Sequence, residues 1–224
     1  MTRHASVMVM LAIVSHTALG QASSPAGLSV GFDILKTMPI FYSSGYVLEP
    51  SLIYTTKNGL MIDMAVGFAN VKKDTLYQNS TYFNQGHYLR LGAGGMILKH
   101  PGQFRQFYLL ADVVYSDFTE RFKVRFRDEG DYYGDAFRTL EQSSRLVALE
   151  VQPGYRLPIG NSGFSVNFQA RFSYVVTEYD ADNFPVYLIP GVGCMGTEKD
   201  TSYNNAATVG ASIRIVYKLL ENNN

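Results

Sequence analysis

The stretch that decides the fold is Gly163–Val176, with the sequence GFSVNFQARFSYVV. Bulky apolar residues recur at every second position from Phe164 to Val176, and the positions between them carry Ser, Asn, Gln and Arg. A period of two places successive side chains on opposite faces of a β-strand. The stretch therefore predicts a strand with one apolar face and one polar face.

The same alternation occurs in the rest of the chain and predicts further strands of similar length. A tilted strand needs about 9–11 residues to cross a bilayer, and these segments are long enough to do so. The other strands are expected at residues 27–36, 45–55, 59–70, 86–98, 105–116, 144–156 and 207–219.

The connections between these strands alternate in length. Residues 56–58, 99–104 and 158–162 are short and carry turn-forming residues, whereas 37–44, 71–85, 117–143 and 177–206 are mostly much longer. Short periplasmic turns and long outer loops are typical of outer-membrane barrels. The pattern predicts an all-β fold, an eight-stranded antiparallel up-and-down transmembrane β-barrel.

The polar face distinguishes a membrane barrel from a soluble one. A soluble barrel, the alternative, would pack large apolar residues inside and expose many Lys and Glu. Here the polar face carries mostly small residues, with about one ionisable residue per strand. We therefore expect a charge network in the lumen, formed by Asp33, Glu49, Asp63, Arg90, Asp112, Glu150, Arg171 and Arg214.

This set holds more acids than bases, so pairing cannot be one to one. Unpaired buried charges are costly. Extra water, a protonated carboxyl group or the participation of Lys218 would make up the difference.

The N-terminus predicts export. Arg3 and His4 precede a short apolar run, and Ala18 and Gly20 fit a cleavage site, so residues 1–20 read as a signal peptide and residues 21–224 as one barrel domain in the outer membrane. The chain has 19 basic and 19 acidic residues, and this zero net charge argues against nucleic acid as a partner. Cys194 is the only cysteine, so no disulfide can form within the chain.

Catalytic and metal-binding residues are not expected. His87, Ser80 and Asp74 could form a hydrolase-type trio at the barrel rim, but Ser and acidic residues are common in loops. Neither His87 nor His100 has neighbours at metal-ligand spacing, and Cys194 has no partner ligand nearby. We predict a protein that is not an enzyme and has no cofactor or metal. A lipid hydrolase or acyltransferase and a narrow pore are the alternatives.

The stretch 117–143 offers a candidate interaction surface. Aromatic and apolar residues alternate there with Arg121, Lys123, Arg125 and Arg127. One interpretation is a hairpin above the bilayer whose basic row meets anionic lipid headgroups or a partner protein. The other is a self-contained hairpin whose basic row is matched by the acids that follow. Tyr187 lies in a proline-bounded apolar segment that could cover the barrel mouth or bind a partner.

Several segments resemble a family of small outer-membrane barrels from bacteroidete bacteria whose function is not assigned. They are Gly31–Ile34, Leu60–Asn70, Tyr88–Gly92 and, in the last loop, Asp182–Gly191. The resemblance implies an outer-membrane barrel and no catalytic residues. We therefore expect a non-enzymatic interaction or scaffolding role at the cell envelope. The charge network would plug the lumen, and the expected partners are outer-membrane lipid and other envelope proteins.

Overall fold

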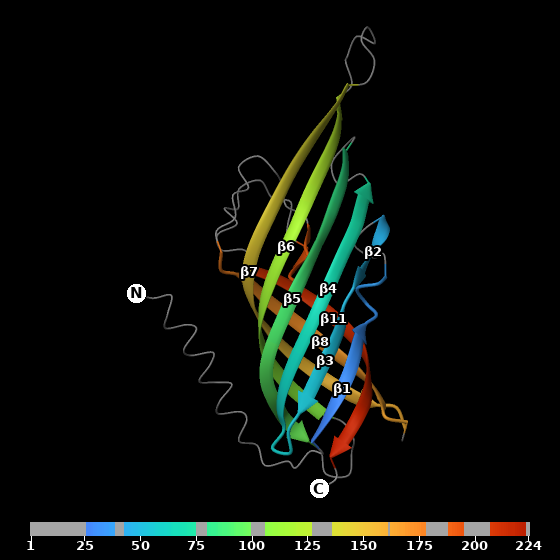
Figure 1. Cartoon of the computed structure of the whole chain (residues 1–224), viewed down its shortest axis with the longest axis vertical. Helices are drawn as coiled ribbons and strands as arrows, with labels where there is room; N and C mark the ends of the chain where they lie inside the picture. Colours follow the sequence, from blue (N-terminus) through green and yellow to red (C-terminus); the bar gives the residue numbers. More distant parts are fainter. Residues whose placement is uncertain are drawn as a thin grey trace, which may run out of the picture.

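The computed structural model describes residues 26–38, 43–74, 80–99, 106–126, 136–160, 162–177, 188–194 and 207–222. The predicted signal peptide lies outside these ranges. Every regular element in them is a β-strand (Figure 1). The strands are β1 (Ala26–Asp33), β2 (Ser44–Leu48), β3 (Pro50–Thr55), β4 (Leu60–Asp74), β5 (Ser80–Lys99), β6 (Gln106–Phe126), β7 (Ala136–Pro158), β8 (Phe164–Val175), β9 (Leu188–Ile189), β10 (Gly193–Cys194) and β11 (Ala207–Asn222).

The sheet closes on itself, and all of its pairings are antiparallel. β1 pairs with β11 on one side and β3 on the other, while β4 pairs with both β3 and β5. The circle continues from β5 through β6, β7 and β8 to β11. Because β2 and β3 both lie along β4, they form one wall strand. The result is a closed eight-stranded barrel, as the sequence predicts.

Local chemistry explains where two strands stop. β1 ends at Asp33, before the predicted Lys36, because the Asp33 Oδ1 accepts the backbone N–H groups of Leu35 at 3.0 Å and Lys36 at 3.3 Å and so turns the chain. The predicted strand 45–55 is interrupted at Glu49. Pro50 follows and has no N–H to donate to a ladder.

Two predicted loops are wrong because they are largely strand. β4 continues to Asp74 and β5 begins at Ser80, which leaves little of the expected loop 71–85. β6 continues to Phe126 and β7 begins at Ala136, so the expected loop 117–143 is mostly a long hairpin. Both interpretations of this stretch included a hairpin. The strands β5, β6 and β7 continue to pair with one another beyond the predicted strand ends, and this pairing extends the β-ladders into the expected loops.

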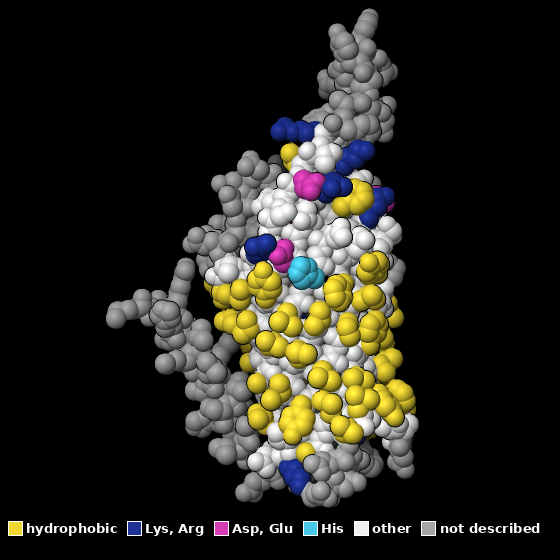
Figure 2. Space-filling view, viewed as in Figure 1, with side chains coloured by type: hydrophobic (Ala, Val, Ile, Leu, Met, Phe, Trp, Pro, Cys, Tyr) yellow, Lys and Arg dark blue, Asp and Glu magenta, His cyan; other side chains and the backbone are white. Residues whose placement is uncertain are grey.

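The outer wall carries an apolar band. Leu91 and Val113 are each 49% exposed, and Phe68 is 50% exposed, although all three are large apolar residues. Figure 2 shows this apolar band on one face, with charged side chains beyond it toward the end where the long connections lie. We call that end the long-loop end and the opposite end, with the turns 56–59 and 159–163, the short-turn end. Among the described residues, no helix could span a membrane.

The interior has three layers. An apolar cluster near the short-turn end contains Met61, Tyr108 and Leu110. A second apolar cluster nearer the long-loop end contains Tyr88, Phe118 and Ile189. Buried charged side chains lie between them, and all eight residues of the predicted lumen network are buried there. These side chains therefore lie inside the barrel, away from the exposed apolar row of the wall.

Candidate functional site

Glu49 is the centre of the buried charge network. Its Oε1 accepts hydrogen bonds from Arg90 Nη1 at 2.6 Å and Arg214 Nη2 at 3.0 Å. Arg171 Nη2 lies 3.6 Å from the same oxygen. The Oε2 atom bonds the Lys36 ammonium and the Tyr88 hydroxyl. One carboxylate therefore faces four cations, and the break between β2 and β3 places it there.

Two more carboxylates complete this charged belt, which comprises Lys36, Glu49, Asp63, Arg90, Glu150, Arg171 and Arg214. Glu150 Oε1 lies 3.1 Å from Arg90 Nε and 3.2 Å from Arg171 Nε. Asp63 pairs with Arg214 Nη1. The belt joins β4, β5, β7, β8 and β11 across the interior, because each of these strands contributes an inward side chain at a similar level of the ladders, and Glu49 joins them from the break between β2 and β3.

Two of the eight predicted residues do not form an ion pair within the described part of the chain. Asp33 accepts a hydrogen bond from Ser212 Oγ at 2.7 Å and stabilises the turn after β1. Asp112 is 3% exposed, and both of its carboxylate oxygens lack a described hydrogen-bond partner. Its Oδ1 lies 1.5 Å from the place a Cβ of Gly92 would take, so it depends on the glycine of the neighbouring strand.

The fourth cation of the belt is Lys36, whereas the sequence suggested Lys218. Strict alternation would put Lys36 on the apolar outer face of a strand reaching residue 36. Because β1 ends three residues earlier, the chain turns and Lys36 Nζ reaches Glu49 and Tyr88 inside the barrel. The sequence analysis does not predict that Tyr88 bonds Glu49, although Tyr88 and Arg90 share the inward face of β5.

The segment Leu188–Cys194, which we call the mouth hairpin, enters the interior from the long-loop end. Arg90 Nη2 donates to Gly191 O at 2.6 Å, and Asn84 Nδ2 donates to Leu188 O at 2.7 Å. Ile189 and Val192 are 2% and 4% exposed within the upper apolar cluster. Of the two predicted roles for this part of the last loop, these contacts favour covering the mouth. Tyr187 lies outside the described residues.

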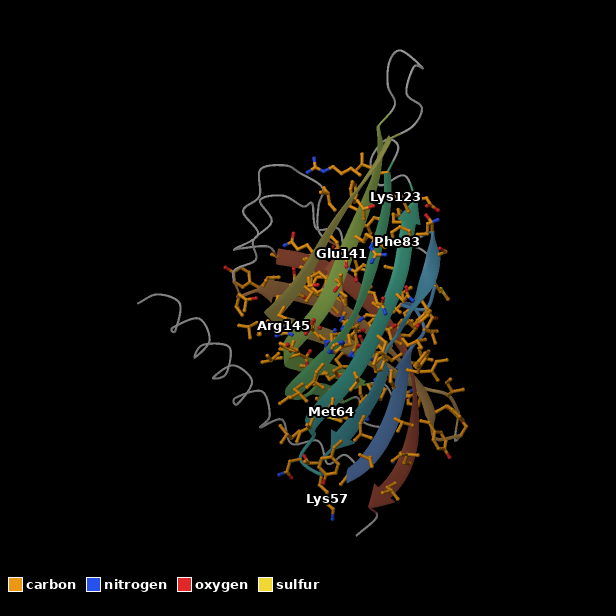
Figure 3. All side chains as sticks on the ribbon, turned by 45° about the horizontal axis from the view of Figure 1, so that its top comes forward. Lys57, Met64, Phe83, Lys123, Glu141 and Arg145 are labelled. Carbon is orange, nitrogen blue, oxygen red and sulfur yellow. The ribbon has the colours of Figure 1, made fainter. Side chains whose placement is uncertain are left out.

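The projecting hairpin, residues 117–126 of β6 and 136–145 of β7, extends beyond the apolar band. On its outer face Arg145 Nε lies 2.8 Å from Asp117 Oδ2, and Arg121 Nε lies 2.9 Å from Glu141 Oε2. Figure 3 shows Lys123, Glu141 and Arg145 on this part of the molecule. Its inner face packs Phe122 against Tyr82. The hairpin is thus braced on both faces.

The predicted basic row is only partly described. Arg121 and Lys123 are exposed, the backbone of Arg125 belongs to β6, and Arg127 lies outside the described residues. The acid that pairs with Arg121 is Glu141 on the opposite strand. The acids Asp128, Glu129 and Asp131, which were expected to match the row, also lie outside the described residues.

The hypothetical catalytic trio does not assemble. Ser80 is 5% exposed and faces inward, whereas His87, seven residues along the same strand, is exposed on the outer wall. Side chains at odd and even positions of a strand point to opposite faces. His100 lies outside the described residues. Among the described residues, no group of His, Cys, Asp and Glu is arranged to hold a metal.

Comparison with known proteins gives a distant structural likeness. No protein-family model matches the sequence, and no curated protein matches it. Among solved structures, the crystal structure of Neisserial surface protein A (NspA) matches with a TM-score of 0.43 and 13% identity, over 87% of this chain and 94% of that one.

Proposed function

We propose that this chain is an outer-membrane barrel that serves as a non-enzymatic interaction or scaffolding protein of the cell envelope. The membrane location is supported by the apolar band outside and the charged belt inside. Backbone groups in lipid must be satisfied internally, which a closed barrel achieves. The segments that resemble the bacteroidete family of small barrels support membership of that family, again as a proposal.

The lumen is proposed to be plugged. Three successive obstacles support this: the mouth hairpin, the charged belt and the apolar cluster around Met61 and Tyr108. The interior of an eight-stranded barrel is just wide enough for side chains to fill it. We expect the purified protein to give no discrete conductance steps in planar lipid bilayers. Regular steps would contradict the plug and favour a narrow pore.

The projecting hairpin carries the interaction role. It continues two paired strands beyond the apolar band and holds exposed charges in fixed cross-strand pairs. A rigid surface loses little conformational entropy on binding, which favours recognition. The expected partner is another envelope protein, while outer-membrane lipid surrounds the apolar band.

The test shortens the hairpin without opening the barrel. Glu120 and Gln142 are paired in β6 and β7, so replacing residues 121–141 by Asn-Gly, a two-residue turn, should preserve the register below them. We expect a partner that co-purifies in fixed ratio from gently solubilised membranes to be lost from this variant. The variant should still migrate as a folded barrel before heating in gel electrophoresis.

The matched control is Lys57→Gln, which removes one exposed charge in a turn at the opposite end of the barrel and leaves the hairpin intact. It should retain most of the partner. If the intact chain purifies alone, or if the shortened chain keeps every partner, the interaction role of the hairpin is wrong.

A further inference from the structure

The described charged side chains of the turns and strand ends at the short-turn end of the barrel are basic. Three of the side chains described at this end carry a charge at neutral pH, namely Lys57, Arg156 and Lys218. The residues considered are 26–30, 50–60, 94–97, 106–110, 153–168 and 215–220. Figure 3 shows Lys57 at this end of the molecule. A cluster of one sign raises the local concentration of small ions of the opposite sign.

Arg156 and Asn167 lie just inside this end, side by side on β7 and β8. Arg156 Nε donates to Asn167 Oδ1 at 3.2 Å, which fixes the orientation of the amide. Its guanidinium also lies over the ring of Tyr108, 6.0 Å from the centroid. Among the described carboxylates, Asp63 interacts electrostatically with Arg156, and none forms an ion pair with it.

Both residues have donor atoms to spare. Arg156 Nη2 and Asn167 Nδ2 are buried and have no hydrogen-bond partner among the described residues, and Asn167 is 0% exposed. Arg214, the next residue along this ladder on β11, has a similarly unpartnered Nε. Leaving buried donors unpaired is costly, so such groups usually meet an acceptor from the protein, from ordered water or from a ligand.

The unpartnered atoms of Arg156 and Asn167 select the chemistry of the ligand. Each is an N–H donor, so a metal cation cannot bind to them, while an anionic oxygen can accept from both. Arginine recognises carboxylate and phosphate groups through charge-assisted hydrogen bonds, which are stronger than neutral ones.

We propose that Arg156 and Asn167 bind a small oxyanion, a phosphate or a carboxylate group, just inside the short-turn mouth of the barrel. This site is separate from the projecting hairpin and does not depend on the proposed interaction role. In the proposed orientation it faces the periplasm.

The direct test uses the purified full-length barrel, folded in a neutral detergent, and radiolabelled inorganic phosphate at constant ionic strength. Equilibrium dialysis should show saturable binding. Arg156→Gln should weaken it by about tenfold or more, because a charge-assisted contact contributes about 1.5–3 kcal/mol, and 1.4 kcal/mol is a factor of ten. Displacement of phosphate by acetate would support the carboxylate form of the ligand, and resistance to acetate would support phosphate.

Asn167→Asp is a second variant of nearly the same shape. Its carboxylate would accept from Arg156 on both oxygens and so occupy the site from within. We expect it to lose phosphate binding while its thermal midpoint without phosphate is at least that of the unmodified chain. If Arg156→Gln fails to fold, as judged by gel mobility before and after heating, phosphate binding by Asn167→Asp is the measurement that tests the proposal.

Arg145→Gln is the matched control, because it removes an arginine that lies near the other end of the barrel and is paired with Asp117. It should bind phosphate like the unmodified chain. Absence of saturable binding in the unmodified chain, or full affinity in Asn167→Asp, would show that these donors meet water only and would overturn the proposal.

Discussion

At the scale of single residues, the carboxylate of Glu49 contacts more cations than any other carboxylate of the charged belt. Arg90, Arg171, Arg214 and Lys36 all lie against it, and it is 0% exposed. A buried ion pair gains little over apolar packing, yet breaking it leaves an uncompensated buried charge. The fold therefore depends on Glu49 more than on any exposed carboxylate.

Glu49→Gln should lower the free energy of unfolding by about 3–5 kcal/mol, because the buried cations lose their common counterion. Urea unfolding of the barrel from lipid vesicles measures this change. Glu141→Gln is the matched control, since its exposed pair with Arg121 is worth about 0–1 kcal/mol. Equal effects of the two substitutions would contradict the central role of Glu49.

Gly67→Ala should also destabilise the barrel. A Cβ at Gly67 would lie 1.9 Å from Cζ of Tyr88, whose ring also lies close to Gly191. Overpacking of this kind costs about 1–3 kcal/mol. The control is Gly210→Ala, where the nearest atom to a new Cβ is 3.9 Å away. If thermal unfolding gives the same midpoint for both variants, the ring of Tyr88 is less confined than described.

At the scale of elements, the projecting hairpin and the mouth hairpin are coupled through Tyr82. Its hydroxyl bonds Glu120 on β6 and accepts hydrogen bonds from Asn84 Nδ2 at 2.9 Å and Leu188 N at 3.2 Å. Phe122 and Leu188 pack around the same ring. The long strands β5 and β6 therefore provide the surface on which the mouth hairpin packs.

Tyr82→Phe should loosen the mouth hairpin and leave the barrel folded. The substitution removes the hydroxyl that accepts the hydrogen bond of the Leu188 amide. Because such a hydrogen bond contributes about 0.5–1.5 kcal/mol, the amide proton should exchange with solvent about 2–10-fold faster. Hydrogen–deuterium exchange measures this rate. Tyr46→Phe changes an exposed ring and should leave exchange at Leu188 unaltered. Unchanged exchange in Tyr82→Phe would mean that other contacts hold the hairpin.

At the scale of the whole molecule, the barrel inverts the usual arrangement of a soluble protein. Its large apolar side chains face outward around the wall, and its charges are buried across the interior. Such a surface is stable only if a non-aqueous medium covers it, because an exposed apolar area of this extent would otherwise drive association. The apolar band is the strongest support for a membrane location.

Leu91→Arg should destabilise the barrel in lipid by about 2–4 kcal/mol, the cost of a charge on the lipid face near the bilayer midplane. Leu91 is 49% exposed and is paired with Met64 and Val113, so it lies well inside the band. Gln85→Arg, on the same strand beyond the band, should cost about 0–1 kcal/mol. Unfolding from vesicles compares the two, and equal costs would place the membrane elsewhere.

The sequence by itself determined the eight strands of the barrel wall, their faces and eight of the buried charged residues. Alternation is a local property, and each side chain follows its own strand regardless of the neighbouring ones. Asp63, Arg90, Arg171 and Arg214 are therefore buried where the pattern predicts them. The same local rule could not set how far β6 and β7 extend, because their upper parts depend on pairing with each other.

Only the tertiary structure decided which charges meet. Lys36 reaches Glu49 because the chain turns at Asp33, and Asp112 stays unpaired because its carboxylate lies over Gly92. The donors of Arg156 and Asn167 come together because β7 and β8 pair in one particular register. Contacts across the interior join residues far apart in sequence, so they depend on closure of the barrel and on the shear between its strands, which no local pattern encodes.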